Sequence, residues 1–151
     1  MAEGSDDGQS PTPRILVVED SPLASALIVQ VLESLGFNDI LCASDGLQAW
    51  AYLEDGKLFD LVICDWMMPK MNGLDVLKQL RASHVNIPFI MITAKKDDDA
   101  YAEAQFHGAT AFIEKPYEVS TLIDAVTQAL QDSKDDGKGS GGQGDANVWD
   151  I

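Results

Sequence analysis

The stretch ILVVED, from Ile15 to Asp20, decides the fold, because it places an uninterrupted apolar run directly before two acids. The run LVICD, from Leu61 to Asp65, repeats the arrangement with one acid. Apolar runs of this length without alternation are typical of parallel strands that are buried on both faces. Ligands of an open parallel sheet bind outside the carboxyl ends of its strands. We therefore predict that the acids of the two runs meet at one edge of a sheet.

Two later apolar runs end in polar residues of other kinds. The run FIMIT ends in Thr93, and AFIE is followed by Lys115. Amphipathic stretches separate the runs, which is the pattern of βα units and a parallel sheet. Strands are expected at about 14–18, 40–43, 61–64, 88–92 and 111–113. Helices are expected to begin near 22, 47, 73, 100 and 118 and to end near 35, 54, 81, 107 and 130.

Residue types at its two ends define the first helix. Ser21 suits the cap, Pro22 suits the first helical position, and Gly36 suits a left-handed cap at the end. The apolar residues between them follow the helical spacing of a core-facing stripe: Leu23, Leu27, Ile28, Val31, Leu32 and Leu35. Cys42 and Cys64 lie in strand-like runs and are interpreted as buried hydrophobic residues, not as a disulfide or a metal site.

Composition divides the chain into one domain and two tails. Residues 1–13 and 132–151 are rich in Gly, Ser and acids, which predicts a disordered N-terminal tail and a flexible acidic C-terminal tail with an apolar tip. Residues 14–131 have the usual size of a single domain. Docking or fold-back of the tip at Trp149 and an inert tail both remain open.

The charge of the chain excludes some classes of partner. The formal net charge is −15, and most of it falls between residues 14 and 131. Nucleic acids and anionic membranes require a basic surface, so neither is an expected partner. The sequence shows no signal peptide and no apolar run long enough to span a membrane, which favours a cytoplasmic protein.

The predicted edge carries the groups that phosphoryl transfer needs. Two carboxylates about 4 Å apart, such as those of Asp20 and Asp65, repel by roughly 4 kcal/mol at an effective dielectric constant of 20. Mg²⁺ relieves such repulsion, and it binds one or two carboxylates together with phosphate oxygens. An aspartate can also be the nucleophile toward a phosphoryl group. Lys115 supplies a positive charge, and the hydroxyl of Thr93 can donate to a phosphoryl oxygen.

These motifs together resemble the receiver domain of bacterial two-component response regulators, of the stand-alone chemotaxis type. The resemblance covers about residues 14–130, in order and with the spacing of the family. Its motifs are Glu19-Asp20, the loop CDWMMPKMNG from Cys64 to Gly73, Thr93-Ala94 and Lys115-Pro116. The resemblance implies an α/β doubly wound, flavodoxin-like fold, with a five-stranded parallel sheet of order 2-1-3-4-5 and five helices.

The resemblance also implies a role for each acid. Asp65 would be the phospho-acceptor. Mg²⁺, or Mn²⁺ in its place, would be held by Asp20 and Asp65, by Glu19 largely through water, and by the main-chain carbonyl of Met67. Met67 lies two residues after the acceptor, and its side chain is unable to position an attacking water. We therefore expect slower self-hydrolysis than with Asn at this position.

The remaining motif residues would respond to phosphorylation. Thr93 would contact the phosphoryl group and move toward it, Lys115 would pair with it, and Phe112 occupies the aromatic switch position of the family. The peptide bond between Lys115 and Pro116 would be cis, as X-Pro bonds allow. Phe112 has no phenol, so its ring is unable to donate a hydrogen bond outward.

The expected function is that of a signalling protein. A sensor histidine kinase or a histidine phosphotransfer protein would donate the phosphoryl group. A change in the face formed by the fourth helix, fifth strand and fifth helix would then alter binding to a flagellar motor switch, a kinase or another regulator. The protein would be no enzyme beyond its own phosphorylation and slow dephosphorylation. It would be a monomer or a phosphorylation-dependent dimer.

Three alternatives stay open at this level. A phosphorelay intermediate would pass the group from Asp65 to a histidine phosphotransfer protein. An aspartyl-phosphate phosphatase generally has a second acid two residues after the nucleophile, where this chain has Met67. A flavodoxin-type cofactor binder shares the strand order, but Glu19-Asp20 would repel its anionic cofactor.

Overall fold

The computed structural model describes residues 12–54, 58–83, 85–94 and 98–134. Within them, five parallel strands form one sheet in the order β3-β2-β4-β5-β6. Their bounds are β2 Arg14–Val18, β3 Asp39–Ala43, β4 Leu61–Asp65, β5 Phe89–Thr93 and β6 Ala111–Glu114. In chain order this arrangement is 2-1-3-4-5, so the predicted sheet and its parallel strands are confirmed.

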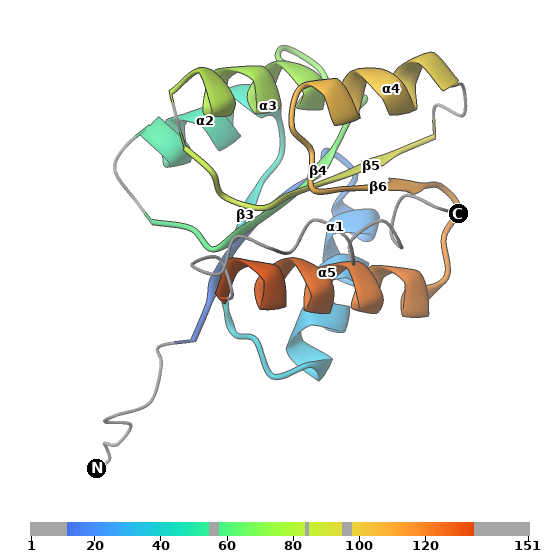
Figure 1. Ribbon diagram of the computed structural model, residues 1–151. Coiled ribbons are helices and arrows are strands. Elements are labelled where there is room, and N and C mark those ends of the chain that lie inside the picture. The colour runs from blue at the N-terminus through green and yellow to red at the C-terminus, as the bar shows by residue number, and fades with distance from the viewer. Residues whose placement is uncertain (1–11, 55–57, 84, 95–97, 135–151) are drawn as a thin grey trace.

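Helices cover both faces of the sheet. Their bounds are α1 Pro22–Ser34, α2 Gly46–Glu54, α3 Gly73–Ala82, α4 Asp98–Phe106 and α5 Val119–Lys134. Figure 1 shows α2, α3 and α4 on one face and α1 with α5 on the other. The five helices in the described residues confirm the doubly wound α/β fold. None of the described helices has the length and apolar character that a membrane crossing requires.

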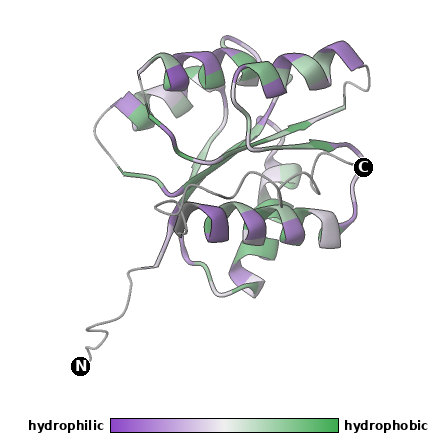
Figure 2. Ribbon diagram, viewed as in Figure 1, coloured by the Kyte–Doolittle hydropathy of each residue, from purple (hydrophilic) through white to green (hydrophobic). Residues whose placement is uncertain are grey.

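The strands divide the hydrophobic core into two layers, because successive side chains point to opposite faces of a sheet. On β2, Leu16 and Val18 belong to the cluster beneath α2, α3 and α4. Ile15 and Val17 belong to the cluster that α1 and α5 cover. Figure 2 shows the resulting hydrophobic strands between helices whose outer faces are more polar. A sheet buried on both faces fixes the strand ends firmly, and the site residues lie at those ends.

The predicted signals of α1 act as expected at both ends. The side chain of Ser21 accepts a hydrogen bond from the Ala24 amide at 3.2 Å, and Pro22 begins the helix. Gly36 has a φ of 95°, the left-handed conformation that ends helices at glycine. The peptide bond between Lys115 and Pro116 is cis, as expected from the resemblance.

Three expectations about burial were wrong. Leu23 and Leu27 are 82% and 45% exposed, because the buried face of α1 begins only at Ile28. Cys42 is exposed because it lies on β3, the edge strand, whose outer side has no neighbouring strand in the described residues. Cys64, on the central strand β4, is buried as predicted, and this burial raises the pKa of its thiol well above the usual value.

Helix α5 is longer than expected, since it runs to Lys134 and not to about 130. The Gln128 side chain donates to the Asp132 carboxylate at 3.0 Å, a spacing that supports one further helical turn. Residues 1–11 and 135–151, which hold most of the two predicted tails, lie outside the described residues. The tip at Trp149 falls among them.

Candidate functional site

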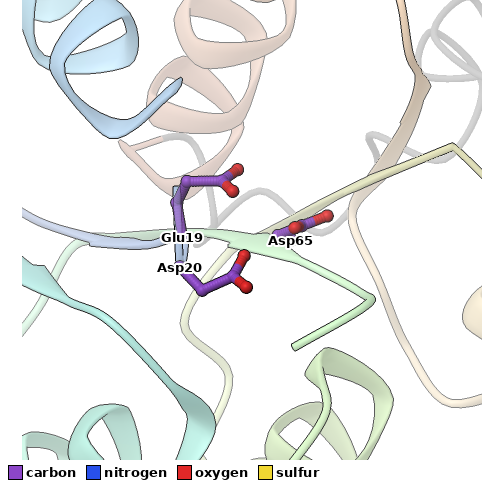
Figure 3. Close-up of side chains that lie close together, drawn as sticks. All are labelled: Glu19, Asp20 and Asp65. Carbon is purple, nitrogen blue, oxygen red and sulfur yellow. The ribbon is translucent and has the colours of Figure 1, made fainter. Parts of the chain in front are cut away.

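Three carboxylates gather where β2 and β4 end. Glu19 and Asp20 follow β2 directly, and Asp65 is the last residue of β4, whose Cys64 pairs with Val18 in the sheet. One carboxylate oxygen from each acid lies within 4.8 Å of the others. Figure 3 shows the side chains extending from neighbouring strand ends. Glu19 and Asp65 are only 4% and 6% exposed, whereas Asp20 is open to solvent.

Lys115 joins two of these acids. Its Nζ lies 3.4 Å from Glu19 Oε1 and 3.5 Å from Asp65 Oδ1. The main-chain amide of Lys115 donates to the carbonyl of Thr93 at 2.8 Å, which fixes the start of the segment after β6. The second carboxylate oxygen of Glu19 accepts from the Ser21 amide at 3.2 Å. Glu19 is thus held from both sides, by a cation and by the cap of α1.

Burial and crowding shift the ionisation of this cluster. Burial, followed by repulsion from Asp65, raises the pKa of Glu19 above its usual value. Burial also raises the pKa of Asp65, although Lys115 opposes this shift. Burial alone would lower the pKa of Lys115, but the attraction of Asp65 and Glu19 outweighs it, and the pKa is raised. The ionised forms of Glu19 and Asp65 are therefore disfavoured by burial, and the attraction of Lys115 does not offset this effect.

This donor set fits a hard divalent cation. Mg²⁺ prefers carboxylate oxygens, and it needs only one or two of them beside water and phosphate oxygens. Glu19, Asp20 and Asp65 supply such oxygens within reach of one another. Two of them are buried with raised pKa values, so additional positive charge would stabilise their ionised forms. The site thus has both the ligands and the electrostatic demand for a cation.

Thr93 and Phe112 lie on the strands next to Asp65. Thr93 ends β5, adjacent to β4, and is fully buried. Phe112 lies in β6, pairs with Met91 across the ladder and is 7% exposed. The sheet therefore brings Thr93, Lys115 and the three acids to one edge. Phe112 lies deeper in the same region, within the layer beneath α2, α3 and α4.

Two glycines hold the loop after Asp65 in place, and the sequence interpretation gave them no role. A Cβ on Gly73 would collide with the carbonyl oxygen of Asp65, and one on Gly46 would collide with the carbonyl oxygen of Met71. The Gly73 amide donates to the Trp66 carbonyl at 2.9 Å. Gly73 was quoted from the sequence only as the last residue of the loop motif. The close approach of two backbones depends on tertiary packing, which the motif does not reveal.

The centre of this loop is strained. Lys70 has a φ of 71°, and the Met71 amide donates to the Pro69 carbonyl at 2.8 Å across it, which makes a γ-turn of the rare kind. Lys70 Nζ lies 3.6 Å from Asp45 Oδ2, at the start of α2. The side chain of Met67 is 57% exposed at the beginning of the loop. The loop is fixed at Gly73 and carries the exposed side chain of Met67 two residues after Asp65.

Comparison with known proteins identifies the family of this chain. The model of the response regulator receiver domain matches residues 15–127, and the chain therefore belongs to that family. It is 39% identical over 120 residues to the chemotaxis protein CheY-3 of Vibrio cholerae, covering 78% of this chain and 92% of that protein. It is 37% identical over 119 residues to the chemotaxis protein CheY1 of Helicobacter pylori, covering 78% and 96%.

Solved structures agree with this assignment. The signal receiver domain of a putative LuxO repressor protein from Vibrio parahaemolyticus has a TM-score of 0.79 and 30% identity, covering 87% of this chain and 99% of that one. The receiver domain of the Francisella response regulator 1452 has a TM-score of 0.74 and 28% identity, covering 80% and 98%. The chain is a receiver domain of the CheY type, which implies phosphoryl acceptance in two-component signalling.

Proposed function

We propose that Asp65 is the phospho-acceptor of this chain and that a phosphohistidine is its donor. The observation that carries the proposal is the position of the Asp65 carboxylate. It is nearly buried at the end of the central strand β4, lies 3.5 Å from the Lys115 ammonium, and faces two further carboxylates. A nucleophile, a fixed cation and the ligands of a metal thus surround one point at the edge of the sheet.

The reaction needs the ionised form of Asp65. One carboxylate oxygen attacks phosphorus, an O–P bond forms, and the N–P bond to the donor histidine breaks. The leaving imidazole nitrogen keeps the electron pair of that bond and is protonated. Lys115 pairs with the transferred phosphoryl group, and the hydroxyl of Thr93 donates to one of its oxygens. These contacts stabilise charge that develops on the equatorial oxygens.

Glu19, Asp20 and Asp65 would hold Mg²⁺, or Mn²⁺, together with the main-chain carbonyl of Met67. The metal supplies neutralisation of the phosphoryl oxygens during transfer. Glu19 would take part largely through water, as the resemblance to receiver domains implies, while its carboxylate accepts from the Ser21 amide and lies against Lys115. Asp20 is the exposed acid of the three and forms the open side of the cluster.

The surface formed by α4, β6 and α5 would change on phosphorylation and would bind the partner. Phosphorylation shifts the population between two packings of this face, and the affinity for a partner changes with it. Thr93 and Phe112 are the residues that respond. The domain spans residues 14–131, acts in the cytoplasm, and catalyses only its own phosphorylation and slow dephosphorylation. It is a monomer or dimerises when phosphorylated.

The relatives named above are chemotaxis proteins, and this favours a target in chemotaxis such as a flagellar motor switch protein. The donor is then a sensor histidine kinase. A phosphorelay, in which Asp65 passes the group to a histidine phosphotransfer protein, is the second candidate. The exposed apolar side chain of Met67 favours it, because a long-lived phosphoryl group suits onward transfer.

The test uses phosphoramidate, a small donor with the same N–P bond, in the presence of Mg²⁺. We expect one phosphoryl group per chain by intact mass, lost in Asp65→Asn and retained in Asp75→Asn, where the changed acid is exposed on α3. Continuous turnover of a phosphomonoester would indicate the phosphatase instead. Labelling that persists in Asp65→Asn would overturn the assignment of the acceptor.

A further inference from the structure

The loop after Asp65 rests on the start of α2. Lys70 Nζ lies 3.6 Å from Asp45 Oδ2, and this ion pair joins the centre of the loop to the residue before the helix. The carbonyl oxygen of Met71 lies so close to Gly46, the first residue of α2, that a Cβ on Gly46 would collide with it. A charged contact and a backbone contact therefore attach the loop to the same short segment.

Asp45 is a fixed point in this segment. Its side chain is only 16% exposed, and its Oδ1 accepts from the Gln48 amide at 2.8 Å, which caps the first turn of α2. The side chain of Gln48 in turn accepts from the Ser44 amide at 2.8 Å. The turn before α2 is thus held by its own hydrogen bonds, and Asp45 presents its other carboxylate oxygen to Lys70.

The same turn is tied to the two acids that follow β2. The Glu19 amide donates to the Ala43 carbonyl at 3.0 Å, two residues before Asp45. The pairing of β2 with β3 runs up to this point without a break. Since Asp20 follows Glu19, both acids belong to the same part of the fold as Asp45. A residue that is anchored to Asp45 is therefore held at a set position relative to both acids.

The loop needs such an anchor at its centre. Lys70 has a φ of 71°, a conformation that residues with a side chain keep only where their surroundings hold them in it. The far end of the loop is held by the hydrogen bond from the Gly73 amide to the Trp66 carbonyl. Met67 lies between these two attachments, and its side chain is too exposed to fix the backbone by packing. The contacts of Lys70 and Met71 with α2 therefore limit where the stretch around Met67 can lie.

We propose that Asp45 and Lys70 form a positioning pair for the metal site. The pair holds the main-chain carbonyl of Met67 at a set position relative to the acids that follow β2. Both residues act through the backbone of the loop and are not ligands themselves. Without the pair, the loop occupies the binding-competent position for a smaller fraction of the time, and the apparent affinity for the cation falls by that fraction. This inference rests on the proposed function, because it concerns the cation that the acceptor site would bind.

The test compares the dissociation constant of Mg²⁺ in Lys70→Met and in Lys78→Met, measured by tryptophan fluorescence. Lys78 is an exposed lysine on α3 and serves as the matched control. Simple electrostatics predicts that removing either positive charge leaves Mg²⁺ binding unchanged or makes it tighter, because like charges repel. The positioning pair predicts the opposite for Lys70→Met, with binding weaker by about two- to fivefold, the range that an exposed ion pair allows. Lys70→Arg keeps the positive charge and should bind Mg²⁺ as the native protein does.

A second measurement needs no metal. Asp45→Asn keeps a residue that caps helices well and leaves the sequence of the loop unchanged. The readout is hydrogen exchange of the Met71 amide, which donates to the Pro69 carbonyl within the loop. In a chelator we expect this exchange to be about three- to tenfold faster in Asp45→Asn, and unchanged in Asp75→Asn on the surface of α3. Equal rates in Asp45→Asn and in the native protein would overturn the proposal.

The outcomes separate this proposal from the proposed function. Mg²⁺ binding to Lys70→Met that is as tight as binding to Lys78→Met would overturn the positioning pair alone, if phosphoramidate still labels Asp65 in the native protein. An absence of Mg²⁺ binding to the native protein would overturn the pair in every case. Together with an absence of labelling, it would overturn the proposed function as well.

Discussion

The Nζ of Lys115 lies between the carboxylates of Glu19 and Asp65, 3.4 Å from the first and 3.5 Å from the second. The lysine follows β6, whereas the acids follow β2 and end β4. One ammonium therefore serves two buried acids that repel each other, and the pKa values of both acids stay raised in spite of it. This arrangement determines how the site responds to mutation, to pH and to metal.

Replacing Asp65 by Asn should stabilise the protein in the absence of divalent metal. The change removes a buried charge that is crowded by other carboxylates, and it loses only part of one ion pair. We expect a gain of about 1–2 kcal/mol in the free energy of unfolding, below the roughly 4 kcal/mol of a bare pair repulsion at 4 Å. Urea denaturation in a chelator measures it. A loss of stability would show that the pair with Lys115 dominates.

The free energy of unfolding of the native protein should depend on pH in a defined direction. The pKa values of Glu19 and Asp65 are raised in the folded state, so the folded protein binds more protons than the unfolded chain above about pH 4. Stability should then fall as the pH rises from about 4 through the raised pKa values, and stay lower above them. Thermal unfolding in a chelator tests this, and Asp65→Asn should show a smaller fall.

Magnesium should reverse that trend. A ligand that binds only the folded state stabilises it in proportion to the logarithm of its concentration over its dissociation constant. We expect Mg²⁺ to raise the unfolding temperature of the native protein most at neutral pH, where the carboxylates are ionised. Asp20→Asn, at the exposed acid, should reduce the effect, and Asp75→Asn should leave it intact. An equal response in the two variants would place the metal elsewhere.

Replacing Met67 by Asn should shorten the lifetime of the phosphorylated protein. The side chain is 57% exposed, so the substitution leaves the core intact. An amide two residues after Asp65 can orient a water for attack on phosphorus, and we expect hydrolysis to be faster by about three- to tenfold. Decay of the phosphoryl label after removal of the donor gives the rate. An unchanged lifetime would contradict the role assigned to this position.

Replacing Gly73 by Ala should displace the backbone at Asp65. The new Cβ would collide with the carbonyl oxygen of Asp65, so either α3 or the end of β4 must shift. We expect a loss of about 1–3 kcal/mol in stability, as for other overpacked sites. Asp75→Ala, at an exposed position of the same helix, is the control for urea denaturation. An unfolding midpoint in Gly73→Ala equal to that of the native protein would show that the loop adjusts to the added Cβ without loss of stability.

Much of this molecule could be predicted from its sequence, because the periodic part of the fold is local. Apolar runs such as Ile15–Val18 gave the strands, and the polar residues at the carboxyl ends of β2, β4, β5 and β6 gave the candidate site. Leu23 and Leu27 follow the same helical spacing as Ile28, yet they lie beyond the end of the covered face. Spacing identifies a stripe along a helix, but where the neighbouring element stops depends on the assembled structure.

Contacts between distant residues were beyond that prediction. Phe112 was assigned to the switch position from the resemblance to receiver domains, but its two aromatic neighbours come from segments that only the folded sheet and α4 bring together. The collision that keeps Gly73 free of a side chain is of the same kind. Both depend on side-chain volume and backbone approach in three dimensions, which no pattern along a single chain records.

Glu19 and Lys115 are joined in the site although 96 positions separate them in the chain. No fragment that lacks either end of this span can form the lysine bridge. A chain emerging from the ribosome therefore acquires the complete site only after β6 has emerged and paired with β5. The complete site is consequently present only in chains in which the segments after β2 and β6 have come together, and copies truncated before β6 should lack the lysine bridge.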